Sequence, residues 1–115
     1  GVRILMATSK PEKYAKQIAE HFGFSQYFDF IGGACMDGRR TDKHEVIEYV
    51  IDSCKVVREN AVMIGDRRHD IIGASKAGIH SIGVLYGYGS REELEKAGAD
   101  MIAVTPGDIL KFVIQ

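Results

Sequence analysis

Two aspartates, Asp66 and Asp70, follow the apolar run Ala61–Ile64. A continuously apolar run is typical of a parallel strand covered on both faces, and Gly65 lets the chain turn sharply as it leaves that strand. We expect a helix to begin at about 67–70, which brings both carboxylates to the edge where doubly wound sheets bind ligands. Because Mg²⁺ prefers oxygen ligands, this spacing indicates a divalent metal site. The alternative is a solvated acidic turn in which Asp70 favours the helix N-terminus.

Two other polar segments could bind phosphate. Thr8 and Ser9 follow the apolar run Val2–Ala7, where a hydroxyl and the N–H groups of a helix start can hold a phosphate oxygen. Alternatively, these two residues only begin the helix. Lys43 is expected in the first turn of another helix, where its positive charge opposes the helix macrodipole. This misfit suggests that Lys43 neutralises a phosphoryl group, although a solvated lysine is the simpler interpretation.

The elements that must position these residues alternate between strand and helix. Apolar runs predict strands at 2–7, 28–34, 61–64, 81–85 and 101–104. Helix starts are predicted at Ser9 with Glu12 (a capping box with Pro11 in the first turn), at Asp42 with Glu45, near 67–70, at Ser90 with Glu93, and at Thr105-Pro106. Gly23 and Gly78 are expected to end the first and third helices. This alternation favours a parallel α/β sheet with right-handed crossovers.

Apolar residues recur at helical spacing in three of these segments and define the faces expected to pack on the sheet. They are Tyr14, Ala15, Ile18, Ala19 and Phe22 in the first helix; Val46, Ile47, Val50, Ile51 and Cys54 in the second; and Ile109, Leu110 and Val113 in the last.

Composition limits the classes of protein and partner. With 115 residues and 45% hydrophobic content, the chain can bury one modest core, which favours a single domain. The net charge of −1, with no basic cluster beyond Arg39-Arg40 and Arg67-Arg68, argues against nucleic acid or an acidic membrane as a partner. Cys35 and Cys54 are expected to be reduced thiols of a cytoplasmic protein. His69 is expected to be a surface histidine rather than a general base.

The order of a hydroxyl, a lysine and paired carboxylates resembles the haloacid dehalogenase superfamily, in particular its phosphoglycolate phosphatase-like branch. The strings that carry the resemblance are Ile4–Pro11 for the second motif, Lys43 within Thr41–Glu45 for the third, and Met63–Asp66 with Asp70 for the fourth. Gly78-Ile79, Tyr86–Gly89 and Ala99-Asp100 also resemble this branch. Three motifs in order at suitable spacing are far more specific than any one of them.

The resemblance implies a three-layer, Rossmann-like sandwich with a mainly parallel sheet. It also implies a Mg²⁺-dependent phosphomonoesterase that acts through an aspartyl-phosphate on a small phosphorylated metabolite. The substrate expected first is 2-phosphoglycolate, and a nucleoside monophosphate is expected next. Thr8, Ser9 and Lys43 are then the expected phosphate-binding residues, and Asp66 and Asp70 the expected metal ligands.

One part of the family pattern is missing from residues 1–115. The first motif, an apolar strand ending in Asp-x-Asp-Gly-Thr, supplies the nucleophile, and its nearest match here, Met36-Asp37-Gly38, is better interpreted as a turn. In the family this strand lies in the middle of the sheet and precedes an inserted helical cap. We therefore expect a C-terminal part of the core domain, inactive alone, in which an N-terminal segment or another chain completes the sheet.

A second class of function stays open, a non-catalytic α/β module that binds phosphate or Mg²⁺. A receiver-like phosphoacceptor places its aspartate before the threonine and lysine, which is the opposite order. A dinucleotide-binding module needs Gly-x-Gly-x-x-Gly after the first strand, and the isolated Gly87-Tyr88-Gly89 does not supply it.

Overall fold

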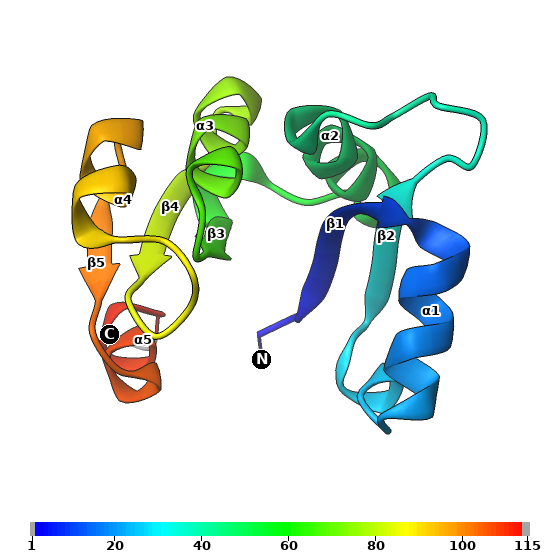
Figure 1. Ribbon diagram of the computed structural model, residues 1–115, viewed down its shortest axis with the longest axis horizontal. Helices are drawn as coiled ribbons and strands as arrows, with labels where there is room; N and C mark the ends of the chain where they lie inside the picture. The colour runs from blue at the N-terminus through cyan, green and yellow to red at the C-terminus, as the bar shows by residue number, and fades with distance from the viewer. Residues whose placement is uncertain (1, 114–115) are drawn as a thin grey trace. The chain divides into compact units, whose positions relative to one another are not determined.

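The computed structural model describes residues 2–113, except for the side chains of Leu110 and Val113. The chain forms two compact units, Gly1–Val57 and Arg58–Gln115. Each unit has its own parallel sheet with helices packed on it (Figure 1). The α/β class and the parallel strands predicted from the sequence are confirmed.

The first unit contains two strands and two long helices. Its elements are β1 (Leu5–Pro11), α1 (Glu12–His21), the 3₁₀ turn η1 (Ser25–Tyr27), β2 (Phe30–Ala34) and α2 (Lys43–Cys54). A Cβ added at Gly32 would meet Val50 of α2, whereas one added at Gly33 would meet Glu12 of α1. Because successive strand residues point to opposite faces, α2 covers one face of this sheet and α1 the other.

Strand β1 differs from the predicted strand 2–7, because it begins at Leu5 and continues to Pro11. Its register with β2 is regular from Leu5 to Ala7 and then shifts before Pro11 pairs with Ala34. The Thr8 hydroxyl accepts a hydrogen bond of 3.2 Å from the Lys10 N–H, a local turn that competes with strand pairing. Thr8 therefore lies within the irregular C-terminal end of β1, which continues to Pro11, and does not follow the strand as predicted.

The predicted capping box at the start of α1 is wrong. Pro11 is the N-cap, with extended backbone angles, so Ser9 lies two residues before the helix boundary. The Glu12 carboxylate accepts a hydrogen bond of 3.2 Å from the Gly33 N–H of β2 instead. The Glu12 carboxylate, which the sequence pattern assigned to the start of α1, therefore binds the backbone of β2.

The apolar face of α1 is buried only in part. Ala15 and Ala19 are buried, whereas Tyr14, Ile18 and Phe22 are 45%, 43% and 64% exposed. The two-stranded sheet of this unit is too narrow to cover a stripe of that width. The helix ends as predicted, because Gly23 has a φ of 76° and the next residue donates its N–H back to the Ala19 carbonyl.

Helix α2 agrees with its prediction in more detail. Asp42 and Glu45 form a capping box, in which the Asp42 N–H donates to Glu45 Oε1 at 3.3 Å. The predicted stripe is buried at four positions, namely Val46, Ile47, Val50 and Ile51, and Cys54 is half-buried. Lys43 is the first residue of this helix, as expected.

The second unit has a three-stranded parallel sheet in the order β3-β4-β5. Its elements are the 3₁₀ turn η2 (Arg58–Asn60), β3 (Val62–Gly65), α3 (Arg68–Ala77), β4 (His80–Val84), α4 (Arg91–Ala97), β5 (Met101–Ala103) and α5 (Pro106–Val113). The buried cluster of Ile82, Val84 and Ala103 packs with Ile109 and Phe112 of α5, whereas a Cβ added at Gly83 would meet Leu94 of α4. Helices therefore cover both faces of this sheet as well.

The helix ends of the second unit follow the predicted signals, with one addition. Gly78 ends α3 with a φ of 74°, and the Ser90 hydroxyl accepts a hydrogen bond of 3.0 Å from the Glu93 N–H at the start of α4. At α5, the carboxylate of Asp108 accepts hydrogen bonds from the N–H groups of Val104 and Thr105. The sequence analysis named Thr105-Pro106 but missed Asp108, which stands three residues after Thr105 in the position of a capping-box acid.

Strands β1 and β3 each have one hydrogen-bonded neighbour in the part of the chain that the structure describes. Strand β1 pairs with β2 in the first unit, and β3 pairs with β4 in the second. Ile64 of β3 is 41% exposed, although the sequence predicts a strand covered on both faces. Completion of the sheet by a segment outside residues 1–115 stays a prediction.

Candidate active site

Thr8 and Ser9 lie in the irregular end of β1. Thr8 is half-buried and its hydroxyl accepts from the Lys10 N–H, whereas Ser9 is exposed. An accepting hydroxyl still has its own hydrogen to donate, so Thr8 can offer that hydrogen to a ligand oxygen.

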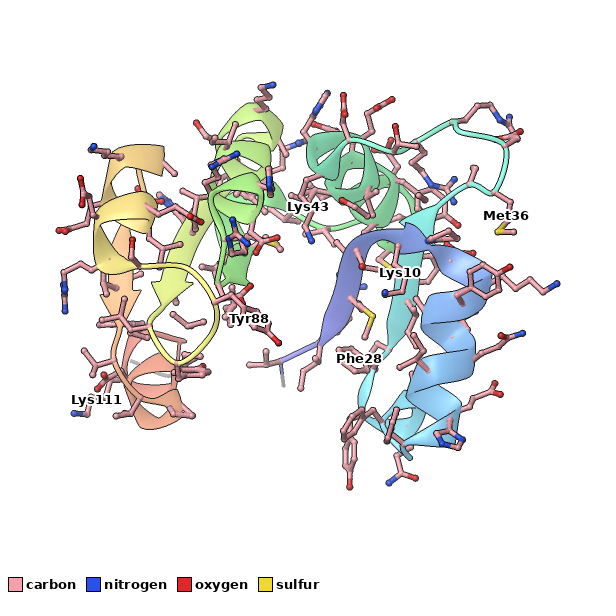
Figure 2. All side chains as sticks on the ribbon, in the orientation of Figure 1. Lys10, Phe28, Met36, Lys43, Tyr88 and Lys111 are labelled. Atoms are coloured by element: carbon pink, nitrogen blue, oxygen red, sulfur yellow. The ribbon has the colours of Figure 1, made fainter. Side chains whose placement is uncertain are left out.

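The side chain of Lys43 reaches back from α2 toward β1 (Figure 2). Its ammonium donates a hydrogen bond of 2.6 Å to the carbonyl of Ala7, the residue before Thr8. An ammonium has three N–H groups, and the Ala7 carbonyl accepts one of them. The fold therefore brings Thr8 and Lys43 to the same end of β1.

A group that the sequence analysis missed, the guanidinium of Arg40, links the elements around this end of β1. Its Nε donates to the Gly33 carbonyl at 2.8 Å, and it lies 3.6 Å from Glu12 Oε1 and 3.6 Å from the centre of the Tyr49 ring. Arg40 has a φ of 53°, which only a few per cent of non-glycine residues adopt. The sequence shows only an arginine three residues before Lys43, so no local signal could have indicated this role.

Asp66 and Asp70 come together at the carboxyl end of β3. Asp66 directly follows Gly65, and Asp70 is in the first turn of α3. The buried Asp70 carboxylate accepts hydrogen bonds from the Asp66 N–H at 3.2 Å and the Arg67 N–H at 3.3 Å. Asp70 thus accepts hydrogen bonds at the helix N-terminus, as the alternative interpretation expected, but it is buried and not solvated as that interpretation assumed.

Two glycines make room for these carboxylates. A Cβ added at Gly65 would overlap the side chain of Asp70, and one added at Gly87 would overlap that of Asp66. The N–H of Tyr88 donates to Asp66 Oδ2 at 2.9 Å. The Gly87-Tyr88-Gly89 segment, to which the sequence analysis gave no role at the site, therefore forms one wall around Asp66.

Glu93 of α4 braces the turn between the two aspartates. Its Oε2 accepts hydrogen bonds of 2.9 Å from both the Arg67 side chain and the Arg68 N–H. The Arg67 hydrogen bond and then the Arg68 N–H hold the pKa of Glu93 below its usual value, and Glu93 in turn raises the pKa of Arg67. His69 in this turn is exposed, as expected.

Asp66 and Asp70 are the candidate metal ligands at the end of β3. Among the described residues no group of three or more histidine, cysteine, aspartate or glutamate side chains could hold a metal ion. Mg²⁺ is commonly held by one or two carboxylates, with water and substrate phosphate completing its octahedron. Asp66 and Asp70 could supply those carboxylates.

The predicted site residues thus form two pairs, Thr8 with Lys43 in the first unit and Asp66 with Asp70 in the second. Convergence of all four residues stays a prediction.

Cys35 and Cys54 form no disulfide. Among the described residues, no helix has the length and apolar character needed to cross a bilayer.

Comparison with known proteins identifies the family. Residues 1–84 match the model of the haloacid dehalogenase-like hydrolases. The chain belongs to this family. The resemblance found in its motifs is therefore confirmed.

Relatives within the family carry several names. A 5'-nucleotidase of Pseudomonas aeruginosa is 48% identical over 94 residues, which are 82% of this chain and 42% of that protein. Tyrosine-protein kinase PtkA of Mycobacterium tuberculosis is 39% identical over 102 residues, 89% of this chain and 35% of that protein. A phosphoglycolate phosphatase of Vibrio cholerae is 29% identical over 115 residues, 99% of this chain and 50% of that protein.

Solved structures show the same fold. The crystal structure of a predicted phosphatase from Clostridium acetobutylicum matches with a TM-score of 0.95 and 45% identity, covering 99% of this chain and 53% of that one. The haloacid dehalogenase-like chain therefore spans between 35% and 53% of the length of these four proteins.

Proposed function

We propose that this chain carries the phosphate-binding and metal-binding residues of a phosphomonoester hydrolase. The observation that carries the proposal is the hydrogen bond from the Lys43 ammonium to the Ala7 carbonyl, which holds a positive charge beside Thr8. The hydrogen bond from the Asp66 N–H to the Asp70 carboxylate, which keeps these two aspartates together at the end of β3, supports a metal site of the kind that phosphate chemistry uses. Relatives named phosphoglycolate phosphatase and 5'-nucleotidase support the same reaction class.

The roles of these residues follow from charge. Catalysis of phosphoryl transfer depends on positioning and on neutralising the negative charge of the phosphoryl oxygens. Lys43 supplies a positive charge to those oxygens, and Thr8, with Ser9 beside it, supplies hydrogen-bond donors. Asp66 and Asp70 would hold Mg²⁺, and the metal would neutralise further charge on the phosphate.

The nucleophile in this proposal is an aspartate outside residues 1–115, because the first motif of the family is not among them. Its carboxylate oxygen forms a bond to phosphorus while the bond from phosphorus to the substrate alcohol breaks. A second aspartate donates a proton to the departing alcohol oxygen. The same aspartate then takes a proton from the water that attacks the aspartyl-phosphate, and this hydrolysis releases inorganic phosphate.

Two substrates follow from the relatives. The motif resemblance favours 2-phosphoglycolate, the substrate expected first from the sequence. The higher identity to the 5'-nucleotidase, 48% against 29% for the phosphoglycolate phosphatase, favours a nucleoside monophosphate. We therefore propose a small phosphomonoester of one of these two kinds.

The proposal is tested in the full-length protein by phosphate release from 2-phosphoglycolate and from a panel of nucleoside monophosphates, with and without Mg²⁺. Asp66→Asn should abolish most Mg²⁺-dependent turnover, because it removes a metal-binding charge. Asp37→Asn is the matched control, since Asp37 is exposed and pairs with Arg39. Equal losses in the two variants would contradict the assignment of Asp66 to the metal.

ATP with a tyrosine-containing peptide is a third substrate in this experiment, because one relative is named a tyrosine-protein kinase. If the peptide is phosphorylated and neither monoester releases phosphate, the function of the site is phosphoryl transfer and not hydrolysis.

A further inference from the structure

The turn that carries Asp66 and Asp70 is held by α4 as well as by its own strand and helix. Glu93 Oε2 accepts one hydrogen bond from the side chain of Arg67 and one from the backbone of Arg68, both at 2.9 Å. These two donors lie between the aspartates in sequence. A single carboxylate oxygen therefore ties the middle of the turn to a helix that begins more than twenty residues later.

The position of Glu93 is itself well determined. Its backbone N–H donates to the Ser90 hydroxyl at 3.0 Å, and the next residue, Leu94, is fully buried against the sheet. A Cβ added at Gly89 would come within 3.1 Å of Glu93 Oε2 and would overlap the Asp66 carbonyl. The start of α4 is thus built close to the turn, and only glycine fits between them.

The Arg68 N–H has a specific need for this partner. Arg68 is the first residue of α3, and the first N–H groups of a helix have no intrahelical acceptor. Asp70 accepts from the two preceding N–H groups, those of Asp66 and Arg67. Glu93 accepts from the next one, so the two carboxylates together satisfy three consecutive donors of the turn.

We propose that Glu93 is a positioning residue for the metal site, acting through Arg67 and Arg68 on the placement of Asp66 and Asp70. The inference rests on the proposed function, because it assigns Glu93 to the same metal site. Residues that orient metal ligands typically contribute about 10- to 100-fold to metal affinity. Glu93 touches neither metal nor substrate in this role, so its loss should act on Mg²⁺ binding before it acts on the chemical step.

The test uses the full-length protein and compares Glu93→Ala with Glu92→Ala. Glu92 is the matched control, because it is the neighbouring residue of the same helix and forms an exposed pair with Lys96. Two quantities are measured without substrate: the dissociation constant for Mg²⁺ by calorimetry, and the hydrogen-exchange rate of the Arg68 amide in metal-free protein by NMR.

We expect E93A to weaken Mg²⁺ binding about 10- to 100-fold, and E92A to leave it unchanged. Exchange of the Arg68 amide should become roughly five- to tenfold faster in E93A alone, since one hydrogen bond is lost. Glu93→Gln keeps an accepting oxygen in place and should recover most of both properties. If E93A folds poorly, Arg67→Ala, which removes the side-chain donor to Glu93, replaces it and should also weaken Mg²⁺ binding.

The outcomes separate the two claims. Suppose that wild-type protein binds Mg²⁺ and that Asp66→Asn weakens this binding. If E93A and E93Q then bind Mg²⁺ as tightly as wild type does, only the role of Glu93 is overturned. Wild-type protein whose Mg²⁺ binding survives Asp66→Asn would overturn the proposed function, and the role of Glu93 with it.

Discussion

The ammonium of Lys43 lies 2.6 Å from the carbonyl oxygen of Ala7, although the two residues are 36 positions apart in the sequence. This contact joins the first residue of α2 to the last regularly paired residue of β1. It places a positive charge beside the Thr8 hydroxyl within one compact unit of this haloacid dehalogenase-like chain.

The first prediction follows from that contact. Lys43→Ala in the full-length protein should lower kcat/KM for the phosphomonoester by about 10²- to 10³-fold, because removing one preorganised charge-stabilising donor has a cost of that size. Steady-state phosphate release measures the loss. Lys13→Ala, at an exposed position of α1, is the control and should leave kcat/KM unchanged. A loss equal to that of the control would remove Lys43 from the site.

Thr8 provides a second prediction, which separates its hydroxyl from its shape. Thr8→Val removes the oxygen that accepts from the Lys10 N–H and also removes a donor to phosphate. We expect kcat/KM to fall roughly 10- to 100-fold, the range for one hydrogen bond to a charged group. Thr8→Ser should restore most of the activity. The idea fails if valine and serine variants release phosphate at the same rate.

The close approach of Gly65 to Asp70 provides a third prediction, on stability. In Gly65→Ala the new Cβ would lie 2.5 Å from Asp70 Cγ, so the strand end or the buried carboxylate must move. Overpacking of this kind typically lowers the free energy of unfolding by about 1–3 kcal/mol. Thermal or urea unfolding measures the change. Gly107→Ala is the control, because its nearest neighbour outside the helix backbone is at an ordinary 3.6 Å.

Asp108 leads to a fourth prediction, on pH. Hydrogen bonds from the Thr105 and Val104 N–H groups hold the pKa of Asp108 below its usual value. A group whose folded-state pKa is lowered stabilises the protein above its unfolded pKa, about 3.9 for aspartate, and loses that contribution as the pH falls through the folded value. Asp108→Asn should therefore unfold more easily than wild type at pH 7, and the difference should shrink below about pH 4. A difference in Tm that is constant from pH 7 to pH 3 would contradict this role.

Local sequence determined much of this molecule. Strand and helix types, the ends at Gly23 and Gly78 and the caps at Asp42 and Ser90 all follow from patterns a few residues long. Such features depend on backbone conformation and on hydrogen bonds between near neighbours, which the residues themselves specify. The pairing of Asp66 with Asp70 belongs to the same class, because only four positions separate them.

Tertiary structure decided the contacts that no local pattern records. Glu12 accepts a hydrogen bond from the Gly33 N–H and does not form the predicted capping box. Arg40 donates to the Gly33 carbonyl, and Glu93 accepts from the Arg68 N–H. In each case a hydrogen-bond donor or acceptor has several possible partners, and the partner it binds belongs to another element of the structure. The sequence alone therefore proposed the candidate site residues, whereas the packing of the elements decided their hydrogen-bond partners.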